Sequence, residues 1–136
     1  METTILQGDC IESMKSMDAK SVDTVITSPP YYGLRDYGKH EQIGLEQTPE
    51  EYIEKMVEVF REVRRVLKDE GTVWLNIGDS YAGSGKGRMG DGSCEATGKQ
   101  ATNKGTVEGT LTKSLTNDVF KPKDLMMIPH RLAIAL

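Results

Sequence analysis

Along the first 81 residues, some segments have the spacing of hydrophobic and polar residues that is typical of strands, and others have the spacing that is typical of helices. The clearest helical pattern spans 48–67, where Thr48 suits an N-cap, Pro49 the first helical position and Glu51 the third. An apolar stripe recurs every three or four residues and predicts one buried face. The stripe consists of Ile53, Met56, Val57, Phe60, Val63 and Leu67. Charged residues occupy the opposite side, which is typical of a solvated helix face.

Three β-rich runs predict strands. The first is the short run Thr4–Gln7. The runs 21–27 and 72–77 show little polar alternation, which predicts strands covered on both faces of a sheet. The run 21–27 stops at two prolines, which cannot continue a sheet ladder, and Gly71 marks the end of the preceding helix.

Two shorter helices are also predicted. Asp9, followed three residues later by Glu12, forms an Asp version of the capping box and predicts a helix over 10–17. Residues 125–136 predict a second helix, in which Pro129 either lies in the first turn or bends the axis. Its stripe consists of Leu125, Ile128, Leu132 and Ala135. The order strand, helix, strand, loop, helix, strand predicts right-handed βαβ units and a parallel sheet.

The chain divides into three parts by composition. Residues 1–81 carry the alternating elements. Residues 82–118 hold eight of the 14 glycines and almost no large apolar side chains, which predicts a flexible Gly-rich insertion. Residues 119–136 begin a further helical part, whose apolar stripe reaches Leu136 without a C-cap. We therefore expect an α/β domain that is truncated.

Bulk properties bound the class of protein. The 136 residues are 37% hydrophobic and 28% charged, which suits one soluble globular domain. A net charge of -4 argues against a dedicated nucleic-acid binder, although a local basic face is enough for an enzyme that acts on DNA. Cys10 and Cys94 lack metal-ligand spacing, so we expect reduced thiols and no metal site. The absence of a signal peptide or a membrane-spanning run predicts a cytoplasmic protein.

The segment most informative about chemistry is Thr27-Ser28-Pro29-Pro30-Tyr31. It follows a predicted strand at the carboxyl edge of a parallel sheet, where open α/β folds bind ligands. The prolines stiffen the turn and direct a carbonyl outward, Ser28 offers a hydroxyl, and Tyr31 offers a flat apolar face with a polar tip. Together they suit a planar ring that bears an amino group. From local chemistry alone, a proline-rich turn that ends a strand explains the segment equally well.

The same five residues resemble the catalytic motif (D/N/S)PP(Y/F/W) of the N4-cytosine and N6-adenine DNA methyltransferases. Other segments are similar to the β-type, circularly permuted members of that family, and they occur in the order of that subgroup. These segments are Gly8-Asp9, 21–26, 32–37, 71–81 and 121–125, with Ile128, Pro129 and Arg131. The resemblance implies a partial Rossmann-like sheet of the class I methyltransferases with flanking helices.

The resemblance also implies the reaction. A methyl group would pass from S-adenosylmethionine to the exocyclic amino group of a base flipped out of double-stranded DNA. Ser28, Pro29, Pro30 and Tyr31 are the implied catalytic residues. Tyr31 would stack on the base, while the Ser28 side chain and the Pro29 carbonyl would accept hydrogen bonds from the amine. A serine before the two prolines favours cytosine N4 over adenine N6 as the target.

Asp9, Thr27 and Asp79 are the candidate cofactor-binding residues. Asp9 is equally well explained as a helix N-cap, and Asp79 as a turn residue. The glycine-rich loop of this family, similar to D-P-F-x-G-S-G-T, does not occur in the chain, nor does the acidic residue expected to bind the ribose. We therefore expect this chain alone to bind S-adenosylmethionine weakly or not at all and to show no turnover.

Arg35, Lys86 and Arg88 are the candidate contacts to DNA phosphates. Lys86 and Arg88 lie in the Gly-rich insertion, for which plain disorder is the alternative. Residues 85–90 match G-x-G-x-x-G, but no strand leads into them and no helical pattern follows, so a dinucleotide site is not expected. Two alternatives to this function remain. One is methylation of amino groups in RNA or protein, and the other is an inert remnant of a phage or mobile element, or a DNA-binding stub without catalysis. The sequence leaves homo-oligomerisation open.

Overall fold

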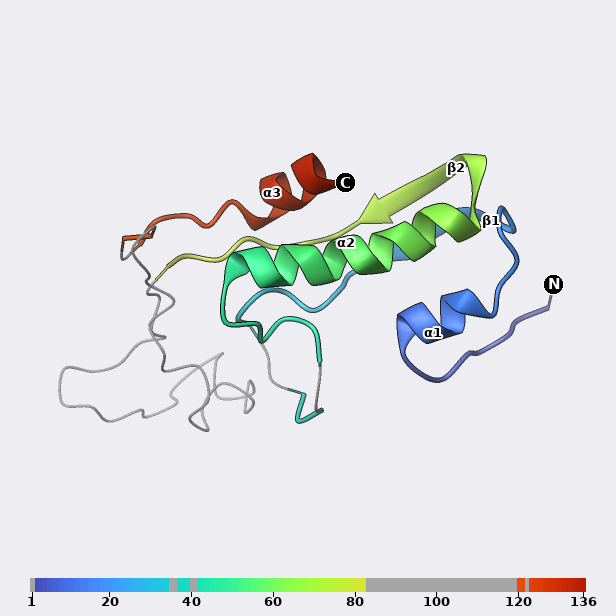
Figure 1. Cartoon of the computed structure of the whole chain (residues 1–136), viewed down its shortest axis with the longest axis horizontal. Helices are drawn as coiled ribbons and strands as arrows, with labels where there is room; N and C mark the ends of the chain where they lie inside the picture. The colour runs from blue at the N-terminus through green and yellow to red at the C-terminus, as the bar shows by residue number, and fades with distance from the viewer. Residues whose placement is uncertain (1, 35–36, 40–41, 83–119, 122) are drawn as a thin grey trace.

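The computed structural model describes residues 2–34, 37–39, 42–82, 120–121 and 123–136 (Figure 1). Its elements are α1 (Cys10–Lys15), β1 (Val22–Thr27), α2 (Pro49–Val66), β2 (Leu67–Leu75) and α3 (Ile128–Ala135). The predicted Gly-rich insertion lies almost entirely outside the described residues.

The strands β1 and β2 pair in parallel, and α2 is the crossover between them, which confirms the predicted parallel α/β arrangement. Thr27 pairs with Leu75 at the carboxyl edge. β2 begins at Leu67, directly after α2, and not at Thr72 as predicted. The reason is that Leu67 already pairs with Val22, and an irregularity in the register accommodates the residues that follow.

Helix α2 begins as predicted, because the Thr48 hydroxyl accepts a hydrogen bond from the Glu51 amide at 3.2 Å. Its buried face is rotated relative to the predicted stripe. Ile53 and Val57 are only half-buried, whereas Tyr52 is fully buried. The buried residues of α2 are Pro49, Tyr52, Met56, Phe60, Val63 and Val66.

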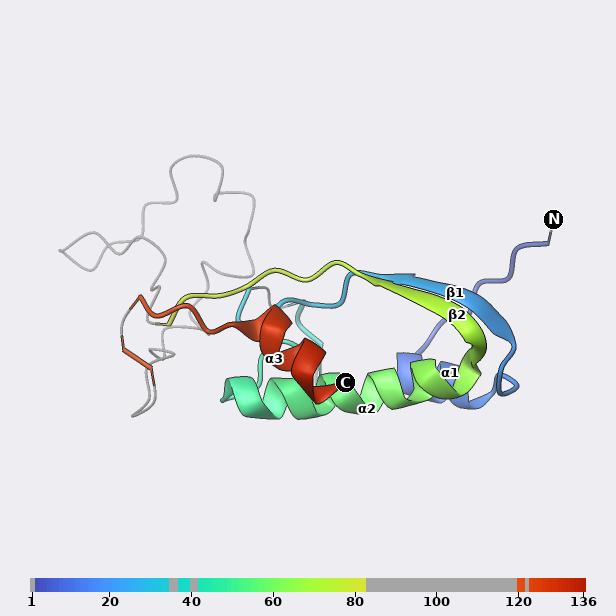
Figure 2. The same ribbon diagram turned by 90° about the horizontal axis from the view of Figure 1, so that it is seen from above.

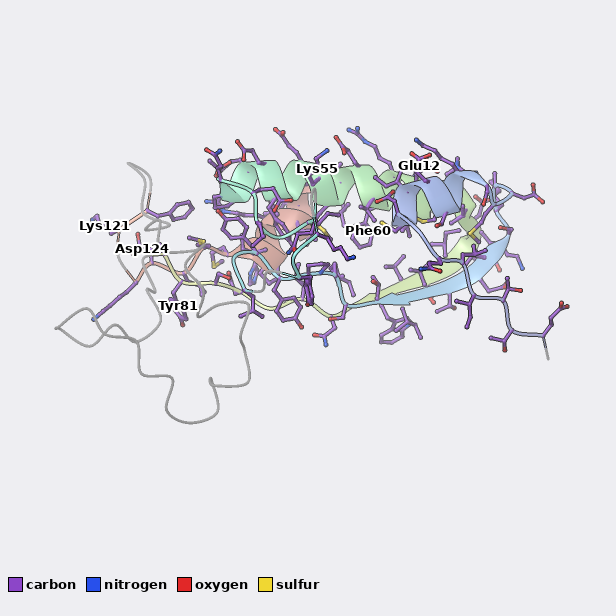
Figure 3. All side chains as sticks on the ribbon, turned by 90° about the horizontal axis from the view of Figure 1, so that it is seen from below. Glu12, Lys55, Phe60, Tyr81, Lys121 and Asp124 are labelled. Carbon is purple, nitrogen blue, oxygen red and sulfur yellow. The ribbon has the colours of Figure 1, made fainter. Side chains whose placement is uncertain are left out.

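All three helices lie on one side of the sheet (Figure 2). Phe60 points from α2 toward the strands, while Lys55 points away from them (Figure 3). On the other face of the sheet, Ile26 is 80% exposed and its partner Trp74 is 66% exposed. The prediction of strands covered on both faces is therefore wrong for the described residues, because no described element lies over that face. In the described ranges, no helix has the length and apolar character needed to cross a membrane.

The prediction of a strand at Thr4–Gln7 is wrong. This segment belongs to neither strand of the described sheet, and Ile5 is 88% exposed. The β-rich composition reports a local preference, whereas a strand also needs a neighbour with which to share hydrogen bonds.

Helix α1 is one turn and a half long and ends at Lys15, two residues earlier than predicted. Its N-cap is confirmed: Asp9 Oδ1 accepts hydrogen bonds from the amides of Ile11 at 2.9 Å and Glu12 at 3.1 Å. Arg65 of α2 donates to two carbonyls at the end of α1, those of Met14 and Met17, at 2.6 and 3.0 Å. These bonds fix α1 alongside α2.

Helix α3 begins at Ile128 and carries Pro129 in its first turn. This confirms the first of the two predicted positions of that proline. Ile128 and Leu132 are buried against α2, but Leu125 and Ala135 are exposed, so the predicted stripe is wrong at both of its ends. Leu125 instead forms an isolated antiparallel bridge with Tyr81, before the helix starts.

Candidate functional site

The segment Ser28 to Tyr31 leaves the sheet at its carboxyl edge, directly after β1. The last strand residue, Thr27, is anchored because its carbonyl accepts a hydrogen bond from the Asn76 amide at 3.0 Å. Ser28 is exposed and the next three residues are half-buried, so the segment lies at the surface and not inside the core. Within the described residues, neither the Ser28 hydroxyl nor the Pro29 carbonyl takes part in a hydrogen bond. Both acceptors are therefore unused within the described fold.

The ring of Tyr31 lies against the chain that continues from β2. A Cβ atom added to Gly78 would come within 2.8 Å of Cε2 and 2.9 Å of Cδ2 of this ring. The Tyr31 hydroxyl donates to Asn76 Oδ1 at 3.5 Å, which is a long and weak hydrogen bond. Gly78 therefore gives the ring its place, because any side chain at that position would displace it.

The Pro30 carbonyl is held from α2. It accepts a hydrogen bond of 2.9 Å from the hydroxyl of Tyr52, a side chain that is 0% exposed. Gly44 supports the same stretch of backbone: its φ is +106°, and an added Cβ would lie 3.1 Å from the Tyr31 carbonyl oxygen and 3.3 Å from Pro30 Cβ. Segments far apart in the sequence thus fix the backbone between the two open acceptors and the Tyr31 ring.

Two buried tyrosines lie next to each other behind the segment. The rings of Tyr32 and Tyr52 have centroids 5.5 Å apart and are tilted by 46°. Burial raises the pKa of Tyr32 to about 12, with the carboxylate of Glu46 adding to the effect. Burial also raises the pKa of Tyr52, again with a contribution from Glu46. Both hydroxyls therefore remain protonated hydrogen-bond donors well above neutral pH.

Asp79 has a structural partner in α3. Its Oδ1 atom accepts hydrogen bonds from the amides of Ser80 at 2.8 Å and Ile128 at 3.0 Å. Ile128 is the first residue of α3, and the preceding Met127 supplies no side-chain cap. Asp79 thus caps a helix that begins 49 residues later. Its structural role therefore extends beyond that of a local turn residue, the alternative given by the sequence.

The three candidate cofactor residues do not form a complete site for S-adenosylmethionine. The Asp9 carboxylate holds the amides of α1, that of Asp79 holds α3, and the Thr27 carbonyl lies in the sheet. In the described part of the chain, no cradle of glycine amides for the methionine end accompanies them. Their role in cofactor binding stays a prediction.

The candidate DNA contacts are not placed by the structure, because Arg35, Lys86 and Arg88 lie outside the described residues. Arg131 forms an ion pair with Glu50 at 2.7 Å, and its guanidinium carbon lies 5.0 Å from the centroid of the Phe120 ring. These contacts give Arg131 a role within the fold.

Sequence reasoning missed four residues that support the segment, namely Gly44, Tyr52, Asn76 and Gly78. A tyrosine among the apolar residues of a helix was the available signal for Tyr52, since a buried phenol usually has a hydrogen-bond partner. Asn76 and Gly78 stand in the stretch GTVWLNIGDSY, where a glycine directly after a strand indicates close approach by another group.

Comparison with known proteins agrees with the resemblance. Residues 22–128 match the family described as DNA methylase. The type II methyltransferase M.SmaI of Serratia marcescens is 44% identical over 97% of this chain and 42% of its own length. M.XycI of Xanthomonas campestris pv. cyanopsidis is 42% identical and M.Cfr9I of Citrobacter freundii 41% identical, each over 98% of this chain and 41% of its own length. No solved structure matches.

The chain spans about two fifths of the length of these relatives. The family match nevertheless covers most of the chain, including the segment Ser28 to Tyr31 and both strands of the sheet. This protein belongs to the DNA methylase family.

Proposed function

We propose that this chain is the base-binding part of a DNA methyltransferase that acts on an exocyclic amino group, built on a Rossmann-like sheet. One observation carries the proposal. Two hydrogen-bond acceptors, the Ser28 hydroxyl and the Pro29 carbonyl, have no hydrogen-bond partner among the described residues, and they precede Tyr31 in a segment whose backbone is tied down at Pro30. An aromatic amine needs this combination of a stacking face and two acceptors.

The residues act on the base by binding and orienting it. Tyr31 stacks on the flipped base, and the two N–H groups of the amine donate to Ser28 and Pro29. In a free base the nitrogen lone pair is conjugated with the ring. Acceptors that draw both N–H groups out of the ring plane weaken that conjugation, so the lone pair becomes available and points in a fixed direction. Most of the rate gain then comes from orientation.

S-adenosylmethionine supplies the methyl group as an electrophile. Relatives such as M.SmaI are more than twice as long as this chain, and no glycine-rich cofactor loop occurs in its sequence. We propose that residues outside this chain bind most of the cofactor and that the 136 residues alone do not turn over. Incorporation of tritiated methyl groups into DNA by the purified 136-residue protein would contradict this.

Ser28 also bears on the target base. A neutral hydroxyl next to Pro29 accepts one N–H bond without adding charge, and in this family a serine there leans toward cytosine. We propose cytosine N4 as the target in preference to adenine N6. Mass spectrometry of nucleosides from digested DNA separates the two, because N6-methyladenine in place of N4-methylcytosine would reverse the assignment.

The direct test of the base-binding segment is the substitution Ser28→Ala in a complete methyltransferase that carries this chain. We expect kcat to fall about 100-fold, as for the loss of one positioned hydrogen-bonding group in other active sites. Stability should not change, since Ser28 is exposed and its hydroxyl has no hydrogen bond in the described part of the fold. Ser21→Ala is the control for activity, because it removes an exposed serine hydroxyl next to the other end of β1, one that donates to the Asp18 carbonyl at 2.7 Å. Full activity of Ser28→Ala would refute the proposal.

A further inference from the structure

We propose that Tyr52 is a positioning residue for the base-binding segment, a role that rests on the proposed function. The hydroxyl of Tyr52 donates to the Pro30 carbonyl at 2.9 Å, a bond that spans 22 residues of sequence. Pro30 lies between the two open acceptors and the stacking ring. A donor that fixes Pro30 therefore fixes the spacing of the groups on either side of it.

The need for such a donor follows from the two prolines. Neither Pro29 nor Pro30 has an amide N–H, so this backbone can be anchored only through its carbonyl oxygens. The Pro29 carbonyl must stay open for the base. The carbonyl of Tyr31 accepts from the Leu34 amide at 3.2 Å, which closes a local turn and gives no link to the core. The Pro30 carbonyl is thus the one that ties the segment to a buried side chain, that of Tyr52.

Tyr52 itself is held rigidly. It lies in the first turn of α2, where its amide donates to the Thr48 carbonyl at 3.2 Å, and its ring packs against Tyr32. A fully buried ring cannot change rotamer without opening the core. Burial raises the pKa of Tyr52, so the donor proton stays in place well above neutral pH. Through the hydrogen bond from Tyr52 to Pro30, the position of α2 therefore determines the position of the base-binding segment.

The neighbouring Tyr32 provides a matched control. It is 1% exposed and belongs to the same ring pair, but its hydroxyl donates to the Gln47 carbonyl at 3.4 Å. That acceptor lies in the loop before α2 and outside the base-binding segment. Removing the hydroxyl of Tyr32 therefore perturbs the same part of the core without releasing Pro30.

The test compares Tyr52→Phe with Tyr32→Phe in a complete methyltransferase that carries this chain. We expect Tyr52→Phe to lower kcat about 10-fold, since small misplacements of reacting groups have effects of this order. KM for DNA should be unchanged, because the stacking ring and both acceptors are still present. Tyr32→Phe should leave kcat unchanged. Thermal unfolding of both variants measures the structural cost of each lost hydroxyl.

Replacement of Tyr52 by 4-aminophenylalanine keeps a donor at the same place and should restore most of kcat. It also decides the matter if Tyr52→Phe does not fold, because it keeps both the ring and a hydrogen bond to Pro30. Equal kcat values for Tyr52→Phe and Tyr32→Phe, or a 4-aminophenylalanine variant no better than Tyr52→Phe, would overturn the role of Tyr52. Full activity of Ser28→Ala would instead overturn the proposed function, so the two failures are distinguishable.

Discussion

Substitution of Gly78 by alanine tests whether the place of the Tyr31 ring matters for catalysis. Gly78 is not among the glycines with positive φ, so alanine can adopt its backbone conformation without strain. The three atoms nearest to the added methyl group all belong to the ring of Tyr31, and the closest two lie at 2.8 and 2.9 Å. The perturbation is therefore directed at the ring of Tyr31.

The size of the effect follows from these distances. Non-bonded carbon atoms settle at about 3.5 to 4.0 Å, so the ring of Tyr31 must move by roughly 0.7 Å or more. A displacement of about 1 Å in a catalytic group can cost on the order of 100-fold in rate, so we expect Gly78→Ala to lower kcat between about 10- and 100-fold. The ring is half-buried and can move toward solvent, so the free energy of unfolding should change by only about 1 kcal/mol or less.

A double-mutant cycle makes the assay specific. Initial rates of tritiated methyl transfer to DNA are measured for Gly78→Ala, for Tyr31→Ala and for the combination. If Gly78 acts only by giving room to the ring, Gly78→Ala should have no further effect once Tyr31 is alanine. Full activity of the single Gly78→Ala variant, or additive losses in the double variant, would refute the reasoning.

Two further predictions concern stability. Asp79→Ala removes the acceptor for the amides of Ser80 and Ile128 and should lower the free energy of unfolding in urea by about 1 kcal/mol, whereas Asp79→Asn keeps an acceptor and should cost less. The pKa of Tyr32 is about 12 in the folded protein and about 10 when the chain is unfolded, and that of Tyr52 is raised as well. The two buried, protonated tyrosines thus make their full contribution to the free energy of unfolding below about pH 10, and this contribution is lost as the pH rises through their folded-state pKa. Urea unfolding across this pH range measures the loss, and tyrosinate absorbance reports the ionisation.

The elements that could be predicted are those whose signals are local. Thr48 and Pro49 mark the start of α2 because a cap and a first-turn proline act within a few residues. Asp9 caps α1 for the same reason. The composition of the run Thr4–Gln7 predicts a strand, but strand pairing depends on a neighbouring strand, which a local pattern cannot reveal. The buried face of α2 differs from the predicted one for a similar reason. A stripe of purely hydrophobic residues leaves out Tyr52, which can be buried because its hydroxyl donates a hydrogen bond to the Pro30 carbonyl.

The candidate site shows the same division. Its residue types and its place after β1 could be predicted from the sequence alone, because a strand that ends at two prolines delivers them to the edge of a parallel sheet. The supporting contacts could not, since the bond between Tyr31 and Asn76 spans 45 residues and that between Asp79 and Ile128 spans 49. No periodicity links positions so far apart.

The supporting contacts explain why a short motif is a weak indicator without its fold. For the proposed role in base binding, the segment needs two properties that oppose each other, namely acceptors without partners and a backbone that does not move. The structure assigns these properties to different groups: Ser28 and Pro29 keep their acceptors open, while Pro30 and Tyr31 are fixed by residues of α2 and of the chain after β2. A Ser-Pro-Pro-Tyr turn in another protein would have the same two acceptors but no buried donor at Pro30 and no glycine against the ring. Such a turn could contact a base, but it could not hold an amine in one direction, and direction is what the proposed methyl transfer requires.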